Sequence, residues 1–228
     1  MKSEELTPVL LVSATEAECV PIMQKLSGSK TLLPYLYSGT LHGLPVELLI
    51  SGIGSVATIF RLSQTVLQRS YSRAISIGIA GSFVNHVNIG ETVQIVEDCF
   101  ADLGIDDNGR FYNLREAGLP CDDFDCDLII NPCPTASSHP KLRGITVQTS
   151  SGSEKRITKL ILRYFPEVET MENAAFFYVC RKTNIPFASY RAISNFVEPR
   201  NRKNWQTEKA IKNVNDSVIQ LFSDSIIQ

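Results

Sequence analysis

The chain has 228 residues, of which 43% are hydrophobic and 20% are charged, the balance of a globular protein that buries a full core without crosslinks. Its 22 basic and 24 acidic residues leave a formal net charge of −2, so we expect no nucleic-acid partner. No apolar stretch is long enough to cross a membrane, and the acidic N-terminus lacks the apolar core of a signal peptide. We therefore expect a cytoplasmic protein without membrane contact, whose six cysteines are reduced thiols.

Short apolar runs alternate with segments of helical periodicity along the chain. The predicted strands cover residues 9–12, 46–50, 74–78, 92–96 and 187–193, and the predicted helices cover residues 54–69, 153–164, 171–179 and 207–227. Strands that alternate with helices predict an α/β fold with a largely parallel central sheet. No internal repeat or long linker divides the chain, so we expect a single domain over residues 1–228.

Residues 98–144 interrupt this alternation, because they are rich in Asp, Pro and Cys. We interpret them as an irregular, solvated excursion from the domain, with a turn over residues 106–109. Their acidic side chains lack the spacing of metal ligands, so no metal site is predicted. A second turn signal, His42-Gly43, predicts a hairpin.

Glu18 is the first candidate for chemistry, because it lies just beyond the first predicted strand. In an open α/β sheet, ligands bind beyond the carboxyl ends of the strands, where a carboxylate can act as a general acid or base. The same segment has the spacing of a capping box, Thr15-x-x-Glu18, which begins a helix and needs no ligand. Taken alone, the motif favours the cap.

Residues 52–57, Gly-Ile-Gly-Ser-Val-Ala, match the G-x-G-x-x-G/A pattern of dinucleotide-binding turns. That pattern also needs an acidic residue about 20 positions later to hold a ribose. No Asp or Glu lies between Glu47 and Glu91, so a nicotinamide cofactor is disfavoured. The glycines still predict a tight turn whose backbone closely approaches another group, with helix–strand packing as an equal alternative.

Two further segments combine small residues or a carboxylate with a predicted strand or helix end. Gly78-Ile79-Ala80-Gly81 follows a strand and would let a ligand lie against backbone N–H groups. Glu172 lies at the start of the predicted helix over 171–179, where it either caps the helix dipole or accepts two neighbouring hydroxyls of a ribose. Met171 begins the apolar stripe of that helix and is by itself typical of a core residue.

Asn195 follows the predicted strand over 187–193 and offers both a donor and an acceptor, although an Asn in a turn or at a helix cap has the same pattern. The next run, Glu198 to Trp205, is basic, contains Arg200 and Arg202, and holds the only Trp. It suits an anionic ligand group, although a solvated surface segment is the default interpretation.

The order of these motifs is more informative than any one of them. A-T-E-A-E, S-G-I-G, G-I-A-G, T-M-E-N-A-A and R-A-I-S-N follow one another between residues 9 and 205, and in this order they resemble the nucleoside phosphorylase and nucleosidase superfamily. Within it, E-T-M-E-N-A-A-F-F-Y-V-C and R-A-I-S-N-F-V-E-P-R-N-R-K-N-W are most similar to the futalosine hydrolase family. The resemblance implies a three-layer sandwich with a mixed central sheet flanked by helices. It also implies hydrolysis of futalosine to hypoxanthine and dehypoxanthine futalosine in the alternative route to menaquinone.

The resemblance assigns the chemical roles to four residues. Glu18 matches the acid that orients and deprotonates the attacking water. Glu172 matches the acceptor of the ribose 2′- and 3′-hydroxyls, and Met171 matches the residue packed under the sugar. Asn195 takes the place of the purine-contacting residue, where it would stabilise the departing base.

The resemblance also implies what surrounds these residues. Gly78, Ala80 and Gly81 match the strip that lines the base and the sugar. Arg200 and Arg202 are our candidates to meet the carboxylate that futalosine carries beyond its 5′ position. No metal or organic cofactor is implied. The partner is a small purine nucleoside, and members of the superfamily are usually homodimers or larger homo-oligomers.

Two departures from the superfamily pattern favour a hydrolase of 6-oxopurine nucleosides. Adenine-releasing nucleosidases have Asp in place of Asn195, because an Asp supplies the proton at N7, whereas an Asn amide donates to N7 or O6 of a departing hypoxanthine. Ile79 replaces a Ser or Thr common near the phosphate or water pocket. The nearby arginines lie within or after a helix rather than at a ligand-facing strand end; they are Arg61, Arg69 and Arg73. We therefore expect water, not phosphate, as the nucleophile.

Two alternatives remain open at this stage. One is another enzyme of the same fold, either a methylthioadenosine/adenosylhomocysteine nucleosidase or another purine nucleosidase or phosphorylase. The other is an inactive nucleoside sensor, which the retained Glu18 and Glu172 disfavour. The purine-stacking aromatic of the superfamily is not evident after Ser151-Gly152, where Lys155 falls, so no residue is predicted for that role.

Overall fold

The computed structural model describes residues 6–122, 128–132 and 134–224. Within these ranges, the strands of the main sheet are β1 (Val9–Ser13), β2 (Ser27–Leu33), β3 (Leu36–Leu41), β4 (Leu44–Ile50), β5 (Arg73–Ser82), β6 (Thr92–Asp98), β9 (Ile129–Ile130), β10 (Lys141–Thr146), β11 (Val168–Thr170) and β12 (Phe187–Phe196). A separate two-stranded ribbon contains β7 (Gly104–Asp107) and β8 (Arg110–Asn113). The helices are α1 (Val20–Lys25), α2 (Ser55–Gln68), α4 (Glu154–Tyr164), α5 (Asn173–Thr183), α6 (Thr207–Ser223) and the short 3-10 helix η1 (Arg202–Asn204).

The main sheet is mixed. Its strand order is β11-β10-β6-β12-β5-β1-β4-β3-β2, with β9 beside β6. β1 runs parallel to β4 and β5, whereas β12 runs parallel to β5 and antiparallel to β6. β11 also pairs with β5, so five strands close into a ring. The mixed sheet that the resemblance implies is confirmed. The largely parallel sheet expected from strand–helix alternation is wrong, because short connections make β2, β3 and β4 an antiparallel meander.

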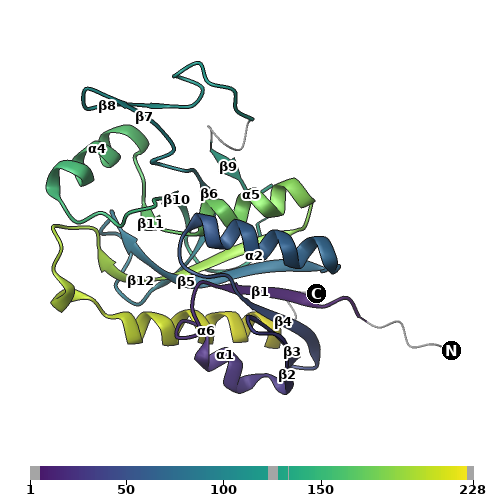
Figure 1. The fold of residues 1–228 in the computed structure, drawn as a ribbon. Coiled ribbons are helices and arrows are strands. Elements are labelled where there is room, and N and C mark those ends of the chain that lie inside the picture. Colours follow the sequence, from purple (N-terminus) through teal and green to yellow (C-terminus); the bar gives the residue numbers. More distant parts are fainter. Residues whose placement is uncertain (1–5, 123–127, 133, 225–228) are drawn as a thin grey trace.

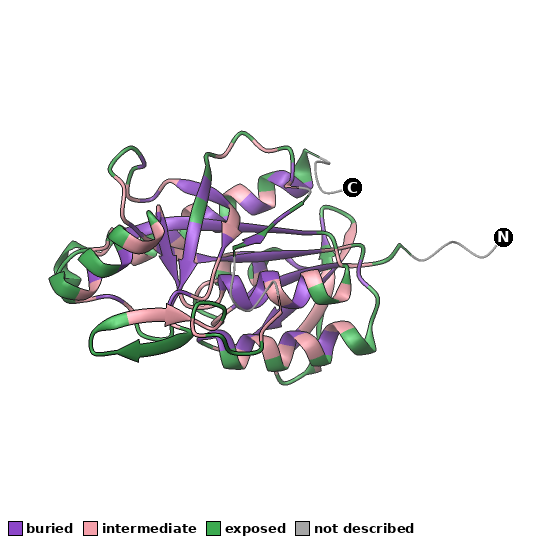
Figure 2. Cartoon of the chain, turned by 90° about the horizontal axis from the view of Figure 1, so that it is seen from above, coloured by how far each residue is buried: buried purple, intermediate pink, exposed green. Residues whose placement is uncertain are grey.

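Helices cover both faces of the sheet, with α2 and α5 on one side and α1 and α6 on the other (Figure 1). β1 therefore has no solvent-facing side: Leu10 and Val12 belong to the core under α2 and α5, and Val9 and Leu11 to the core over α1 and α6. Seen from above, the buried residues concentrate in the strands, and the outer faces of the helices are exposed (Figure 2). Burial on both faces explains why this strand is continuously apolar instead of alternating.

Both predicted turns are confirmed. His42 and Gly43 connect β3 to β4 with φ angles of 49° and 81°, and Asn108 and Gly109 connect β7 to β8 with φ angles of 50° and 85°. Positive φ at both central positions is the condition for the tight turn that matches strand twist.

Two element boundaries differ from the predictions at positions that matter for the site. β5 continues to Ser82, so Gly78, Ala80 and Gly81 lie within a strand rather than after one, because β12 pairs with β5 over that whole length. α5 begins at Asn173. Met171 is therefore not part of a helical stripe, and it lies between β11 and the helix.

The interpretation of residues 98–144 as a solvated loop is wrong for much of the described part. This segment contains the β7–β8 ribbon, β9 and most of β10, which pairs with β6 inside the main sheet. The polar composition of this segment is compatible with β-structure, because the β7–β8 ribbon is separate from the main sheet and β7 is exposed to solvent along its whole length. Residues 123–127 and 133 of the predicted excursion lie outside the described ranges.

Cys121 is disulfide-bonded, whereas Cys19, Cys99 and Cys180 are free. The expectation of reduced thiols throughout is thus wrong for Cys121, since spacing along the chain does not reveal which sulfur atoms meet in space. The described ranges contain neither a group of three or more side chains suited to hold a metal ion nor a helix long and apolar enough to cross a bilayer. The terminal helix ends at Ser223, and the positions predicted beyond Asp224 are not described.

Candidate functional site

A pocket of about 530 Å³ opens where β1, β5 and β12 end. This is the edge at which α/β sheets bind ligands. The structure brings the predicted site residues together there. The pocket is lined by Glu18, Ala80, Gly81, Met171, Glu172, Asn195, Arg200 and Arg202. Gly78 lines a smaller cavity that shares Glu18 and Glu172 with this pocket.

Glu18 is held at the pocket wall by two donors. The hydroxyl of Thr15 donates to Oε2 at 3.0 Å, and the backbone N–H of Ile79 in β5 donates to Oε1 at 3.3 Å. A Cβ atom at Gly78 would lie 3.0 Å from Oε1, so glycine there leaves room for the carboxylate. The structure thus shows why a glycine suits position 78 beside this acid.

The capping-box interpretation of Thr15-x-x-Glu18 is confirmed only in its first half: the Glu18 backbone N–H donates to the Thr15 hydroxyl at 3.4 Å, but no helix begins there. α1 begins only at Val20, and its cap position, Cys19, makes no side-chain capping bond. The Glu18 side chain turns into the site instead of back to the Thr15 backbone N–H, because Ile79 on a neighbouring strand offers it a donor. The spacing of Thr15 and Glu18 along the chain fits a helix cap and a carboxylate turned into the site equally well.

Glu172 is the N-cap residue of α5, and a second helix holds its carboxylate. The backbone N–H of Gly54, at the N-terminus of α2, donates to Oε1 at 2.7 Å. Burial raises the pKa of Glu172, and the nearby Glu18 charge adds to the rise, while the Gly54 N–H and the charge of Arg191 oppose it. The bond from Gly54 uses one lone pair of the Glu172 carboxylate, so others remain available to a ligand in the pocket.

The Gly52-Ile53-Gly54 turn binds an anion of the protein itself. Gly52 and Gly54 have φ angles of 87° and 84°, and a Cβ at Gly52 would lie 2.9 Å from the Cβ of Ala57. The expected close backbone approach is confirmed, and the group approached is the Glu172 carboxylate. A helix N-terminus that serves a dinucleotide phosphate in other proteins here positions a side chain.

Arg191 is a site residue that the sequence analysis did not single out. It is 3% exposed on β12, and its Nη2 donates to the Ser76 hydroxyl at 2.9 Å. Burial lowers the pKa of its guanidinium, while the carboxylates of Glu172 and Glu18 oppose the fall. The only available signal was a charged residue inside an apolar strand, which is rarely buried without a partner.

The smaller cavity, of about 10 Å³, has carboxylate, hydroxyl and guanidinium groups in its wall, supplied by Glu18, Glu172, Ser76 and Arg191. One water molecule needs a space of about 10–15 Å³ and two to four polar partners. The cavity therefore fits a single water and is too small for a phosphate ion.

A chain of buried hydrogen bonds connects Arg191 to the core. Its Nη1 donates to the hydroxyl of Ser189 at 3.2 Å, Ser189 donates to Asn173 Oδ1, and Asn173 Nδ2 donates to Asp98 at 2.8 Å. Burial raises the pKa of Asp98 to about 7, although the hydrogen bonds from Asn173 and Thr146 oppose the rise. Because Asn173 is the first residue of α5 and directly follows Glu172, this chain fixes both the guanidinium and the start of the helix.

Asn195 has a defined amide orientation. Its Oδ1 accepts from the hydroxyl of Ser194 at 2.7 Å, and its Nδ2 donates to the carbonyl oxygen of Phe196 at 2.8 Å. An amide nitrogen carries two N–H groups, so one remains for a ligand in the pocket. The side chain therefore acts there as a donor.

The outer wall of the pocket combines cations with an aromatic ring. The guanidinium groups of Arg200 and Arg202 lie 5.8 Å and 5.9 Å from the centre of the Trp205 ring, and all three residues line the pocket. Trp205 is a second pocket residue to which the sequence analysis gave no role.

The other arginines considered as phosphate ligands point elsewhere. Arg61 donates to the carbonyl oxygen of Ile50, Arg69 pairs with Glu47, and Arg73 donates to the hydroxyl of Thr135; the bonds are 2.9, 3.0 and 3.4 Å long. None of the three lines the pocket at the strand ends. This agrees with the expectation from their sequence positions.

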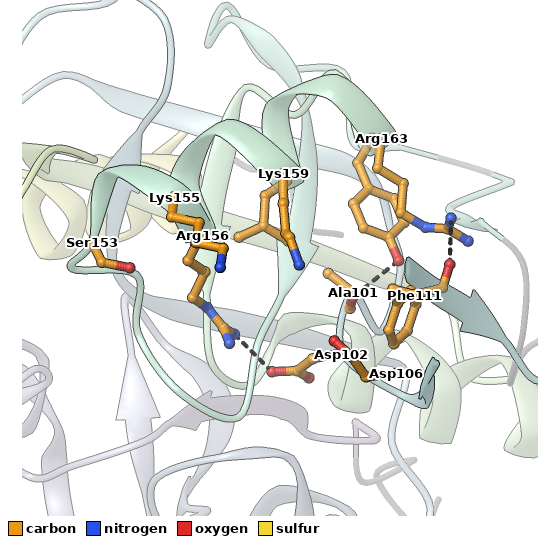
Figure 3. A pocket seen from close by; sticks show the side chains of 11 residues that line it. Ala101, Asp102, Asp106, Phe111, Ser153, Lys155, Arg156, Lys159 and Arg163 are labelled. Carbon is orange, nitrogen blue, oxygen red and sulfur yellow. Dashed lines mark hydrogen bonds and ion pairs between the residues drawn. The ribbon is translucent and has the colours of Figure 1, made fainter. Parts of the chain in front are cut away.

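A second hollow, of about 290 Å³, lies between α4 and the β7–β8 ribbon (Figure 3). Three of its basic side chains already have protein partners, among them Lys159, which donates to the carbonyl oxygen of Gly109 at 2.8 Å. Arg156 pairs with Asp102 at 3.0 Å, and Arg163 donates to the carbonyl oxygen of Phe111 at 3.2 Å. No predicted site residue lines this hollow. We therefore assign the chemistry to the pocket at the strand ends.

Comparison with known proteins finds relatives that match most of this chain. The chain is 28% identical over 201 residues to a 5'-methylthioadenosine/S-adenosylhomocysteine nucleosidase of Anoxybacillus flavithermus, covering 82% of this chain and 84% of that protein. It is 25% identical over 194 residues to futalosine hydrolase of Thermus thermophilus, covering 81% and 84%. Its fold matches the solved futalosine hydrolase of Helicobacter pylori with a TM-score of 0.81 and 16% identity, covering 97% of this chain and all of that one.

The match to a family model extends over residues 8–223, from the strand before Glu18 to the last turn of α6. It includes every element that lines the pocket. The chain therefore belongs to the phosphorylase superfamily, as the order of its motifs predicts.

Proposed function

We propose that this N-glycosyl hydrolase cleaves the bond between ribose and a 6-oxopurine, with futalosine as its substrate and hypoxanthine as the released base. The observation that carries the proposal is the water-sized cavity between Glu18, Glu172 and Arg191. Relatives of both kinds, a futalosine hydrolase and a methylthioadenosine/adenosylhomocysteine nucleosidase, support hydrolysis as the reaction class. The choice of futalosine places the enzyme in the alternative route to menaquinone.

In the proposed reaction, a water in the small cavity attacks C1′ while the bond to the purine nitrogen breaks. Glu18 accepts a proton from the water, and the purine leaves with the bonding electron pair. The Thr15 hydroxyl and the Ile79 N–H hold the Glu18 carboxylate in one orientation, so it need not reorganise during the reaction. Proton transfer by a positioned side chain contributes about 10²–10⁴ to a rate.

The ribose is bound by Glu172, with Met171 beneath the sugar. Oε1 of Glu172 is used by Gly54 N–H, which leaves the other oxygen and the second lone pair of Oε1 for the 2′- and 3′-hydroxyls. The backbone of Met171 is itself held by the Ser55 hydroxyl, which donates to its carbonyl oxygen at 3.2 Å. Both sugar contacts are therefore positioned by the N-terminal turn of α2.

Asn195 stabilises the leaving base. Because its oxygen accepts from Ser194 and its nitrogen keeps one N–H beyond the bond to Phe196, it suits N7 or O6 of hypoxanthine, where negative charge builds as the bond breaks. An adenine-releasing enzyme instead needs a proton at N7, which an amide does not supply.

Arg200 and Arg202 meet the carboxylate of the 5′ group, and Trp205 offers a flat face to its aromatic ring. All three residues line the pocket. Guanidinium groups pair well with carboxylates.

Self-association is a further part of the proposal. One face of α2 exposes large apolar side chains: Val56 is 79% exposed, Phe60 62% and Leu67 77%. An apolar hollow of about 440 Å³, lined by Phe100, Leu103 and Tyr178 among others, adjoins the start of this face. A protruding ring beside a hollow is self-complementary across a two-fold axis, so we propose a second copy of this chain as the occupant.

The test is chromatography of released bases, with futalosine, inosine and methylthioadenosine offered separately in phosphate-free buffer. Hypoxanthine from futalosine is the expected product. Adenine from methylthioadenosine would contradict the choice of substrate and favour the salvage nucleosidases. Base release only after phosphate is added would contradict water as the nucleophile.

The variant Glu18→Gln separates a hydrolase from a sensor. We expect it to bind futalosine with an unchanged dissociation constant while kcat falls about 10²–10⁴-fold. Its matched control is Glu16→Gln, because Glu16 belongs to the same turn but its carboxylate accepts from the Tyr37 hydroxyl and does not line the pocket; this variant should keep its activity. A wild-type protein that binds but releases no base, like Glu18→Gln, would favour the sensor.

A further inference from the structure

Asp98 is a buried carboxylate that the proposed mechanism does not use. It is 0% exposed at the end of β6, and it lines neither the pocket at the strand ends nor the small cavity. We propose that Asp98 is a positioning residue which, through Asn173 and Ser189, determines which edge of the Arg191 guanidinium faces the water-sized cavity. This inference rests on the proposed function, because that cavity is where the attacking water is placed.

The direction of these hydrogen bonds is set at Asp98, because an ionised carboxylate only accepts. Its Oδ1 accepts from the Thr146 hydroxyl at 3.0 Å, and its Oδ2 accepts from Asn173 Nδ2 at 2.8 Å. With its nitrogen turned to Asp98, the Asn173 amide presents Oδ1 to Ser189, whose hydroxyl donates to it. That hydroxyl has one hydrogen, so its lone pairs are left for Arg191 Nη1, which donates at 3.2 Å. We call the four residues from Asp98 to Arg191 the Asp98 network.

The network also decides which N–H groups of Arg191 remain free. Nη1 has two acceptors for its two hydrogens, since it also donates to the Tyr190 carbonyl oxygen at 3.0 Å. Nη2 donates to the Ser76 hydroxyl, and no hydrogen bond among the described residues uses Nε. A Cβ at Gly78 would lie 3.6 Å from Nε and 3.0 Å from Glu18 Oε1. The Nε edge therefore borders the space beside Glu18, in the wall of the small cavity.

A glycine makes room for the carboxylate at the other end of the network. A Cβ at Gly144 of β10 would overlap Asp98 Oδ2, and it would lie 3.0 Å from Asp98 Cγ and 3.1 Å from Ile95 Cγ2. Oδ2 is the atom that accepts from Asn173. Because Gly144 has no positive φ, an alanine there suits the backbone. Its methyl group would displace the Asp98 carboxylate while every polar group of the network is retained.

The sugar contacts are held from another part of the fold. The Gly54 N–H holds the Glu172 carboxylate, and the Ser55 hydroxyl holds the Met171 carbonyl oxygen, both from the N-terminal turn of α2. A break in the Asp98 network is therefore expected to lower kcat and to leave KM nearly unchanged.

Ser189→Ala and Gly144→Ala interrupt the network at different places. With futalosine, or with whichever nucleoside releases a base, each should lower kcat about 10- to 100-fold, because a small displacement of a positioned group has that effect. The double variant should lose no more than the more severe single variant, since the same connection is broken in both; independent effects would multiply. Assays well above the Asp98 pKa of about 7 keep the carboxylate ionised.

The matched control is Ser82→Ala. Ser82 is as buried as Ser189, at 0% exposed, but its hydroxyl bonds to backbone groups of Val84 and Glu167, and it lines neither the pocket nor the small cavity. This variant should keep the wild-type kcat. Losses that multiply in the double variant would overturn the inference, and so would a normal kcat in Ser189→Ala and Gly144→Ala.

Nuclear magnetic resonance of ¹⁵N-labelled arginine keeps this test separate from turnover. The Arg191 signals are those that disappear in Arg191→Lys. Wild-type protein should give separate Nη1 and Nη2 signals, because hydrogen bonds on both nitrogens hold the guanidinium in one orientation. Ser189→Ala and Gly144→Ala should bring these signals together as the group rotates.

The two measurements distinguish the possible failures. If no nucleoside is hydrolysed but the Arg191 signals respond as expected, the proposed function fails while the positioning by Asp98 stands. Signals that stay separate in both variants overturn the positioning. Should Gly144→Ala not fold, Asn173→Ala removes the amide between Asp98 and Ser189 and takes its place in both measurements.

Discussion

Three charged side chains of the site are positioned by groups from other parts of the chain. Glu18 is held by a backbone N–H of β5, Glu172 by the N-terminus of α2, and Arg191 by the hydroxyl of Ser76. Buried charges are tolerated only when such partners satisfy them. At the scale of residues, the placement of these side chains thus depends on backbone N–H groups and a hydroxyl from distant segments.

The cations of the outer wall provide a prediction at this scale. Arg200→Ala and Arg202→Ala should each raise KM for futalosine about 3- to 10-fold, the value of a partly solvated ion pair of about 1 kcal/mol. They should leave KM for inosine nearly unchanged, because inosine has no carboxylate beyond its 5′ position. The measurement is steady-state kinetics on both substrates.

Arg110→Ala is the matched control for these variants. Arg110 lies on the exposed β7–β8 ribbon over the Tyr112 ring, away from the pocket. It should change neither KM. Equal increases for futalosine and inosine in the Arg200 and Arg202 variants would contradict the contact with the 5′ group.

At the scale of elements, the turn before α2 holds two residues that line the pocket, Glu172 and Met171. Gly54 has φ 84° and ψ 164°, a conformation that only glycine adopts readily, and its N–H holds the Glu172 carboxylate. The same helix end supports the carbonyl of Met171 through Ser55. A change in backbone geometry at this turn is therefore expected to reach the ribose site without any contact to substrate.

Gly54→Ala tests this connection. A Cβ at Gly54 would meet only the Gln148 side chain at 3.8 Å, so the effect comes from backbone strain of about 1–3 kcal/mol. We expect the free energy of unfolding to fall by that amount, and kcat/KM to fall more than 10-fold as the Gly54 N–H leaves Glu172. Chemical denaturation and kinetics measure the two effects.

Gly28→Ala is the control for Gly54→Ala. It separates the effect of backbone strain on stability from the loss of the bond that positions Glu172. Gly28 also has a positive φ, 64°, and no atom lies within 4 Å of the place that an alanine methyl group would take. It lies in β2, away from the pocket. This variant should lose stability and keep its activity. If both variants keep normal kcat/KM, the turn does not position Glu172.

At the scale of the whole molecule, the exposed α2 face departs from the usual placement of apolar residues. The helical spacing of Val56, Phe60 and Leu67 resembles a buried stripe, yet the side chains of this helix that face the core include Ser55, Thr58 and Thr65. A contiguous exposed apolar patch marks an interaction site. Phe60 protrudes where a second copy would bury it.

Phe60→Glu tests the proposed self-association. Light scattering after size exclusion should give wild-type protein a mass of about twice the 25.3 kDa of one chain. Phe60→Glu should move it toward the single-chain mass, because an interface cannot bury an unpaired carboxylate. The control, Leu162→Glu, changes a residue of α4 that is 69% exposed outside the patch and should keep the wild-type mass. A monomeric wild-type protein would contradict the proposal.

The amino-acid sequence alone determined the elements with strong periodicity and the turns with strong local chemistry. Strand β1, helix α4 and the His42-Gly43 hairpin follow from residues that are neighbours in the chain. The order of the motifs was also sufficient to indicate the superfamily, because that order is itself a property of the sequence. The reaction assigned to each site residue stays a prediction.

Only the tertiary structure decided which interactions those residues make. The Thr15-x-x-Glu18 spacing suits both a helix cap and a site acid, and the Ile79 N–H on another strand selects the second. Arg191 begins the R-A-I-S-N motif but was given no role, since its role depends on partners such as Ser76 that strand pairing brings together. Likewise, the exposure of the α2 stripe depends on which face packs against α5. Local propensity acts over a few residues, whereas burial and hydrogen-bond partners come from segments more than a hundred positions apart, as between Gly54 and Glu172.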